Sequence, residues 1–254
     1  MTLRLFVLCA LAAAAAPAGD SPFAGKWKVN AARSDFSQIT VTIESLPGGE
    51  WQTSSFGMTA KYKMDGKDYP DGMGGTISWK AVDTNTWETV EKANDKIIET
   101  DTFKLSSDGQ SLTQVSKTNK TDGGSVESTT VFSRASAGSG LAGTWKTREA
   151  PNASGTIEYV ASGSDGLTYK DIDQGMTCEA RLDGKDYPCT GPLVPPGFTV
   201  SMKSSGRVLD FTVKNAGKPF FSATVTVAAD GKSMTEVVTP ASGGEKIRIV
   251  YDRM

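Results

Sequence analysis

The hexapeptide Asp65-Gly66-Lys67-Asp68-Tyr69-Pro70 occurs a second time, unchanged, as Asp183-Gly184-Lys185-Asp186-Tyr187-Pro188. The step from position 65 to position 183 is 118 residues. A second pair of segments repeats with the same step, because Phe23-Ala24-Gly25-Lys26-Trp27-Lys28 corresponds to Leu141-Ala142-Gly143-Thr144-Trp145-Lys146. Two separate motifs in one register indicate that the chain is a tandem duplication.

The duplication predicts the domain organisation. We expect a first repeat over residues 19–134 and a second over residues 141–254. The segment 135–140, Ala-Ser-Ala-Gly-Ser-Gly, has the composition of a flexible linker between them.

Residues 1–18 have the features of an export signal. Arg4 gives a positive start, an apolar run follows from Leu5 to Ala16, and small residues stand at Ala16 and Ala18. We therefore expect cleavage near Ala18 and a secreted or periplasmic protein. The apolar run is too short for a permanent anchor and no second one follows, so no membrane span is expected.

Composition limits the chemistry of the chain. The 254 residues contain no His, which excludes Ser-His-Asp and Cys-His catalysis and His-based zinc sites. Lys and Arg number 27 against 29 Asp and Glu, so no strongly basic surface for nucleic acid is expected. No catalytic signature, metal site or cofactor motif is present, and we expect a protein that is not an enzyme.

The hydrophobic pattern has the period of two that is typical of strands with one buried face. Ile39, Val41 and Ile43 alternate with polar residues, and the segment 221–227 behaves in the same way. Turn signals such as Asp-Gly recur about every 8–12 residues. These patterns predict an all-β chain of two tandem, small, antiparallel up-and-down barrels, with roughly eight short strands per copy and no helix after the signal.

The repeated hexapeptide is interpreted as a hairpin turn, since Asp-Gly favours tight turns and Pro limits the following strand. A cation site formed by its two carboxylates is the alternative, which the intervening Lys67 and Lys185 disfavour. In the second copy, Cys178 and Cys189 flank this turn and are expected to form a disulfide, with a redox-active pair as the alternative.

A Gly-x-Trp motif on the first strand and an Arg on the last strand resemble the calycin superfamily, which includes lipocalins and fatty-acid-binding proteins. The resemblance implies that the Arg lies over the Trp and closes one end of each barrel. Within each copy it pairs Trp27 with Arg134, and Trp145 with Arg253. The hexapeptide also resembles a repeat of uncharacterised secreted bacterial lipocalin-like proteins. The helices of lipocalins and fatty-acid-binding proteins are not visible in this sequence.

Burial explains the Trp residues without a ligand. Removing the 150–250 Å² of an indole from water is worth roughly 4–6 kcal/mol, and a stacked Arg adds about 0.5–2 kcal/mol. We therefore expect Trp145→Ala to unfold the second domain.

Comparison of the two copies suggests a ligand site. With a step of 122, the apolar stretch 221–227 aligns with Glu99, Asp101, Phe103 and Leu105, so the first barrel would carry two inward carboxylates. Trp79 would lie near them. The alternative is a one-residue slip that turns Ile98, Thr100 and Thr102 inward and leaves both acids in water.

Three functions follow from this reading. The first is a non-catalytic carrier of a small, partly apolar or amphipathic ligand, which requires a cavity of about 300 Å³ or more. The second is an envelope structural or protein-interaction module with filled barrels. The third, a carboxylate-based hydrolase, requires two acids about 5–10 Å apart.

Overall fold

The computed structural model describes residues 21–254 with the exception of 151 and 193. The expected signal peptide and its cleavage site lie outside the described residues. In the part of the chain that is described, no helix is long and apolar enough to cross a membrane.

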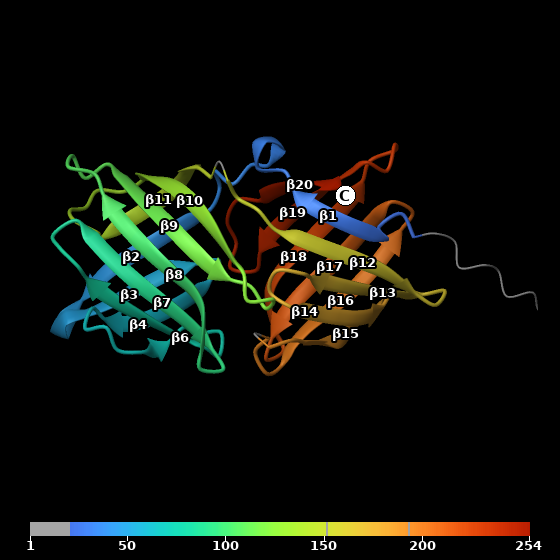
Figure 1. Ribbon diagram of the computed structural model, residues 1–254, viewed down its shortest axis with the longest axis horizontal. Helices are drawn as coiled ribbons and strands as arrows, with labels where there is room; N and C mark the ends of the chain where they lie inside the picture. The colour runs from blue at the N-terminus through green and yellow to red at the C-terminus, as the bar shows by residue number, and fades with distance from the viewer. Residues whose placement is uncertain (1–20, 151, 193) are drawn as a thin grey trace, which may run out of the picture.

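The described residues form two antiparallel barrels that lie side by side (Figure 1). Each has ten strands, more than the roughly eight expected, because several turns are too short to be recognised in the sequence. Barrel 1, a nearly closed sheet, consists of β2 (Thr40–Leu46), β3 (Glu50–Ser55), β4 (Met58–Lys63), β5 (Tyr69–Pro70), β6 (Thr76–Ala81), β7 (Thr86–Ala93), β8 (Lys96–Leu105), β9 (Ser111–Asn119), β10 (Ser125–Arg134) and β11 (Gly143–Glu149). Barrel 2, which is closed, consists of β1 (Gly25–Val29), β12 (Thr156–Ser162), β13 (Gly166–Asp171), β14 (Met176–Arg181), β15 (Asp183–Thr190), β16 (Phe198–Ser205), β17 (Val208–Asn215), β18 (Lys218–Val227), β19 (Ser233–Pro240) and β20 (Ile247–Arg253). Two short 3-10 turns, Ala31–Arg33 and Pro47–Gly49, complete the regular structure.

The first strands of the two copies are exchanged between the barrels. Strand β1, from the first copy, lies between β12 and β20, with Trp27 opposite Ile157 and Arg253. Strand β11, from the second copy, lies between β10 and β2. Figure 1 shows blue β1 among the yellow to red strands of barrel 2. Each barrel is therefore made of nine strands of one copy and the first strand of the other.

The exchange changes the expected boundaries. The segment 135–140 does not connect the barrels, because it lies in the turn of the β10–β11 hairpin inside barrel 1. The connections between the barrels are residues 30–39, from β1 to β2, and residues 150–155, from β11 to β12. Two strands separated by only eight residues pair locally at a small cost in loop-closure entropy, which favours the observed hairpin.

The Trp–Arg closure is present in both barrels, but its partners come from different copies than expected. Arg134 lies over Trp145 and Arg253 lies over Trp27, each guanidinium carbon 4.1 Å from the ring centroid. Each Trp Nε1 also donates to the carbonyl four residues before it, at 2.8 Å for Trp27 and 2.9 Å for Trp145. The pairing within each copy was therefore wrong, because the strands that carry the Trp residues have changed places.

The Gly of each Gly-x-Trp motif makes room for this Arg. A Cβ at Gly25 would lie 2.7 Å from Nη1 of Arg253, and one at Gly143 would lie 2.5 Å from Nη1 of Arg134. The guanidinium of Arg253 donates to the carbonyls of Gly231, Ala24 and Pro22. That of Arg134 donates to the carbonyls of Gly109, Ala142 and Gly140. The motif is thus explained by closure of the barrel end.

The opposite ends of the barrels, which we call the mouths, face each other. A turn at the mouth of barrel 1 brings Gly57 against Ser242, and another brings Thr121 against Gly175 of barrel 2. The amide of Asn94 donates to the carbonyl of Pro192 at 2.6 Å. These turns all lie at the end away from the Trp–Arg closure, since successive turns of an up-and-down barrel alternate between its ends.

The repeated hexapeptide makes similar side-chain contacts in both copies, but it is not the hairpin turn that the sequence predicted. In the second copy it belongs to strand β15, with a bulge between Asp183 and Asp186 that its Gly permits, and in the first copy only Tyr69–Pro70 form a strand, β5. Asp65 accepts hydrogen bonds from the backbone amide of Lys67 and the hydroxyl of Tyr69. Asp183 accepts the equivalent bonds from Lys185 and Tyr187. The second Asp of each copy pairs with a distant Lys at 2.7 Å, Asp68 with Lys92 and Asp186 with Lys214. Both carboxylates of the hexapeptide therefore have structural roles.

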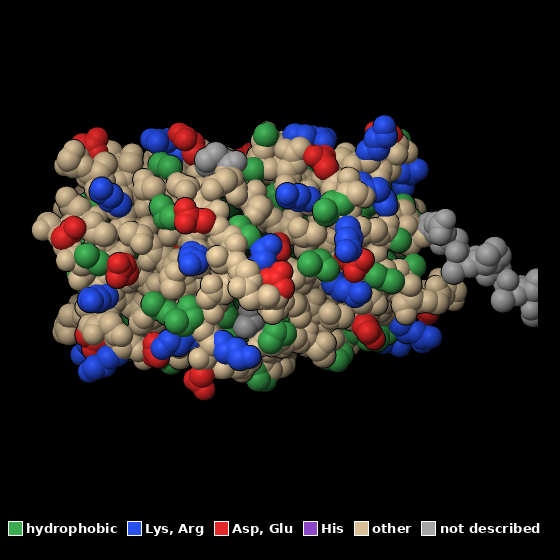
Figure 2. Space-filling model, in the orientation of Figure 1, with side chains coloured by type: hydrophobic (Ala, Val, Ile, Leu, Met, Phe, Trp, Pro, Cys, Tyr) green, Lys and Arg blue, Asp and Glu red, His purple; other side chains and the backbone are tan. Residues whose placement is uncertain are grey.

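The outer surface carries interspersed charges. On the face drawn in Figure 2, Lys and Arg side chains alternate with Asp and Glu side chains and with small apolar spots. The large exposed apolar residues of the described chain include Val82, Ile97 and Ile172, which belong to different strands or turns. This face offers no single-sign patch that would select a charged macromolecule.

Candidate ligand-binding cavities

Each barrel encloses a cavity, and the two cavities differ in chemistry. The cavity of barrel 1 measures about 180 Å³ and that of barrel 2 about 230 Å³. Both are smaller than the 300 Å³ expected for a carrier. A 150 Å³ apolar cavity holds benzene, so these volumes correspond to ligands of about one ring with a short substituent.

The polar wall of the barrel 1 cavity comes from β7, β8 and β9. Their register places Thr89 opposite Asp101 and Glu91 opposite Glu99, and on the other side it places Asp101 opposite Ser116. Residues directly opposite each other on adjacent strands share a face of the sheet, and the burial of Thr89, Asp101 and Ser116 shows that this is the inner face. Polar residues of three neighbouring strands thus meet inside the barrel.

Asp101 is the best-held carboxylate in this wall. It is 5% exposed. Its oxygens accept hydrogen bonds from the hydroxyl of Thr89 at 2.6 Å, from the amide of Gln114 at 2.8 Å and from the hydroxyl of Ser116. A buried carboxylate needs such partners, since an unpartnered one would cost several kcal/mol.

Glu91 and Glu99 lie between Asp101 and the mouth. Burial, assisted by the negative charges of Glu99, Asp101 and Asp71, raises the pKa of Glu91 to about 8. Burial, and then the charge of Asp101, raises the pKa of Glu99 to about 7, although the hydroxyl of Thr118 donates to it at 2.6 Å. The charges that act on these two acids are all negative.

Two aromatic rings, those of Trp79 and Phe103, line this cavity, and Tyr62 packs behind Trp79. Trp79 is stacked between Tyr62 and Phe103, with ring centroids 5.1 Å and 5.0 Å apart and interplanar angles of 6° and 19°. The hydroxyl of Tyr62 is satisfied by Thr53 at 2.6 Å. Nε1 of Trp79 has no hydrogen-bond partner within the described residues, although the side chain is only 2% exposed.

The structure brings together the residues proposed from the comparison of the copies. Trp79, Asp101 and Phe103 line the cavity, and Glu99 lies on the same face of β8 nearer the mouth. The one-residue slip is not observed, since Thr102 is exposed while Asp101 and Phe103 are buried.

Sequence reasoning missed the contribution of the neighbouring strands. Glu91 follows Trp87 and Thr89 with a period of two, and this alternation was the signal that could have placed it inside. Gln114 lies in the same way on the inward face of β9. The equivalent residues of the second copy, 122 positions later, are apolar with one exception. Glu91, Glu99 and Asp101 correspond to Val213, Phe221 and Ala223, whereas Gln114 corresponds to Glu236.

The barrel 2 cavity is mostly apolar. Its lining includes Phe198, Val200, Met202, Phe211 and Val238. Part of its mouth is covered by residues from outside the barrel, since Phe36, Ile39 and Phe56 pack beside the buried residues Ala223, Val238 and Ile247. The sequence predicted a ligand inside one or both barrels but singled out no residue of this interior, because apolar strand faces are also what a filled core presents.

A small polar group stands inside this apolar cavity. Glu236 is 8% exposed and accepts a hydrogen bond from the hydroxyl of Tyr251 at 2.7 Å. Burial raises the pKa of Glu236, and burial together with this carboxyl raises the pKa of Tyr251. Tyr159 and Tyr169 line the same cavity, with ring centroids 5.5 Å apart.

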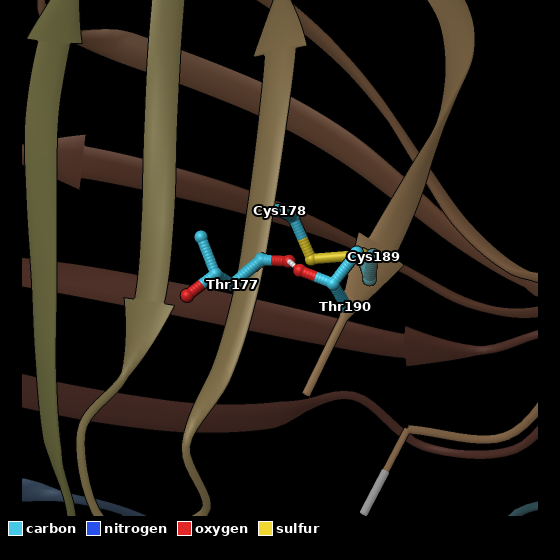
Figure 3. The surroundings of a disulfide bond; sticks show 4 residues. All are labelled: Thr177, Cys178, Cys189 and Thr190. Atoms are coloured by element: carbon cyan, nitrogen blue, oxygen red, sulfur yellow. Dashed lines mark hydrogen bonds between the residues drawn. A yellow bond between two sulfur atoms is a disulfide. The ribbon is translucent and has the colours of Figure 1, made fainter. Parts of the chain in front are cut away.

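A disulfide forms part of the barrel 2 wall. Cys178 of β14 and Cys189 of β15 are directly opposite each other and are bonded (Figure 3). Both residues line the cavity. The expected disulfide is therefore present, and it links β14 and β15 at one of the two residue pairs through which these strands are joined.

No arrangement of three or more His, Cys, Asp or Glu side chains suited to a metal ion occurs among the described residues. No protein-family model matches the chain, and no curated protein sequence matches it significantly.

Proposed function

We propose that this chain is a secreted, non-catalytic binding protein that holds a small, partly apolar molecule inside barrel 2. The observation that carries the proposal is the cavity of about 230 Å³, walled by apolar side chains around the Glu236–Tyr251 pair. An apolar pocket with few polar groups is the usual form of a small-molecule site. The polar pair would orient a ligand that offers one hydrogen-bonding group.

The proposed membership in the calycin superfamily is consistent with this function. Ten up-and-down strands per barrel and an Arg over a Trp at one barrel end support it. The disulfide supports an oxidising compartment, and with it export of the chain.

The two alternatives have less support. An interaction module with filled barrels would leave no interior space, whereas both barrels contain cavities. A carboxylate hydrolase needs two acids that flank a substrate, whereas Asp101 is occupied by hydrogen bonds from Thr89, Gln114 and Ser116.

Native mass spectrometry of the purified protein would identify a molecule that accompanies it. Binding of indole and naphthalene, followed by calorimetry, would then test barrel 2 directly. We expect Val200→Trp, which fills this cavity, to abolish binding, and Ile77→Trp in the barrel 1 cavity to leave it unchanged. Equal binding by Val200→Trp and the unmodified protein would refute the proposal.

A further inference from the structure

The polar wall of barrel 1 is not used by the function proposed above. It combines two independent features. One is the group of inward acids, Glu91, Glu99 and Asp101, of which Glu91 and Asp101 line the cavity and Glu99 lies on the same face of β8. The other is the buried indole N–H of Trp79, in the same cavity, without a partner among the described residues.

A buried hydrogen-bond donor without a partner lowers the stability of the fold by about 1–3 kcal/mol, and buried acids without a positively charged partner lower it further. Such a combination is expected where a ligand completes the hydrogen bonds. The complement of the Trp79 N–H is an acceptor atom, and the complement of the acids is a cation that donates hydrogen bonds. The rings of Trp79 and Phe103, which line the cavity, provide an apolar wall beside them.

We propose that the barrel 1 cavity is a second binding site, specific for a small organic cation that carries an ammonium group, a flat or ring-shaped body and a hydrogen-bond acceptor. The ammonium would lie against Asp101 and Glu99, and the acceptor would lie against Nε1 of Trp79. The cavity volume of about 180 Å³ limits the ligand to roughly the size of a substituted benzene.

A monoatomic cation fits this wall less well than an ammonium ion. Asp101 already accepts hydrogen bonds from Thr89, Gln114 and Ser116, which leaves few oxygen lone pairs for a metal. Calcium requires six to eight oxygen ligands. An ammonium ion needs only three acceptors, and its apolar body gains from contact with the aromatic rings.

Binding of a cation should release protons from the wall. The groups that face Glu91 are Glu99 and Asp101 of β8 and Asp71 of the β5–β6 turn, while β9 contributes the neutral Gln114, Ser116 and Thr118. Because Glu91, with a pKa of about 8, and Glu99, with a pKa of about 7, lose their protons as the pH rises through this range, the affinity for an ammonium ligand should rise by roughly tenfold from pH 6 to pH 8.

The test uses two pairs of probes of matched size, tyramine with 4-propylphenol and benzylamine with benzyl alcohol. Because the neutral partners also suit the barrel 2 cavity, binding is measured on the whole protein carrying Val200→Trp, which fills that cavity, by calorimetry and by tryptophan fluorescence at pH 6 and pH 8. We expect each amine to bind at least tenfold more tightly than its neutral partner at pH 8. Trp79→Phe should weaken tyramine, which carries an acceptor, more than benzylamine, which carries none.

Variants test whether the amines bind in the barrel 1 cavity. Asp101→Asn should weaken amine binding at least tenfold, and the isosteric Glu99→Gln provides a second test should Asp101→Asn not fold. Glu88→Gln, on the exposed face of β7, is the matched control and should have no effect. Val200→Trp separates this proposal from that for barrel 2, because it should abolish indole binding and leave amine binding intact. Amines that bind no better than their neutral partners, or that bind equally to Glu99→Gln and Glu88→Gln, would overturn the proposal.

Discussion

Replacing Glu91 by Gln should change the pH dependence of stability. The pKa of Glu91 rises in the folded protein from the usual 4.5 to about 8. Below pH 4.5 the folded and unfolded chains both hold the proton, so Glu91 imposes no ionisation cost. Between pH 4.5 and pH 8 the unfolded chain releases the proton and the folded chain retains it, so the free energy of unfolding falls as the pH rises. Above pH 8 the loss is complete.

The size of this loss follows from the pKa difference. A difference of about 3.5 at ~1.4 kcal/mol per pH unit sets an upper limit of about 5 kcal/mol. Solvent at the mouth screens the charge, since Glu91 is only partly buried by area, and we expect about 2–3 kcal/mol. Glu99, with a pKa of about 7, adds a smaller loss over a lower pH range.

Urea denaturation followed by tryptophan fluorescence provides the measurement. Four of the five Trp residues, Trp51, Trp79, Trp87 and Trp145, belong to barrel 1, so the emission reports mainly on that barrel. We expect the unmodified protein to lose stability from pH 5 to pH 8, and Glu91→Gln to lose markedly less. Glu88→Gln should follow the unmodified protein. The reasoning fails if the unmodified protein gains stability over this range, or if Glu91→Gln has the same pH profile.

Three further predictions concern the framework. Trp145→Ala should destabilise barrel 1 by about 3–5 kcal/mol, because Trp145 is fully buried there. Amide hydrogen exchange should accelerate in β8, which belongs to barrel 1, but not in β18, which belongs to barrel 2. Acceleration in β18 alone would contradict the strand exchange. The double variant Cys178→Ser and Cys189→Ser should lower the unfolding free energy of barrel 2 by about 2–3 kcal/mol, and a reductant should have the same effect on the unmodified protein. Arg253→Lys should lower the unfolding free energy by about 1–3 kcal/mol in calorimetry, because a Lys ammonium cannot reproduce the hydrogen bonds that the planar guanidinium donates to three backbone carbonyls. An unchanged melting temperature would refute this role of Arg253.

The candidate site was partly predictable. The period-two pattern of β8 placed Glu99 and Asp101 on one face, and comparison with the apolar second copy suggested that this face is buried. Their neighbours could not be identified, because the sequence does not state which strands are adjacent or in what register. Glu91 lies beside Glu99 and Asp101 only because it pairs with Glu99 across β7 and β8. Whether Nε1 of Trp79 finds a hydrogen-bond partner depends on every side chain around it.

By itself, the sequence determined the number of barrels, their all-β class, and the motifs that close them. Local chemistry sufficed for this, since alternation, Asp-Gly turns and the Gly-x-Trp motif each act over a few residues. Only the tertiary structure decided which first strand completes which barrel. Strands β1 and β11 carry the same motif and fit the same position between a last strand and a second strand. The choice therefore rests on chain connectivity, in which the short β10–β11 turn favours local pairing and leaves β1 to complete barrel 2.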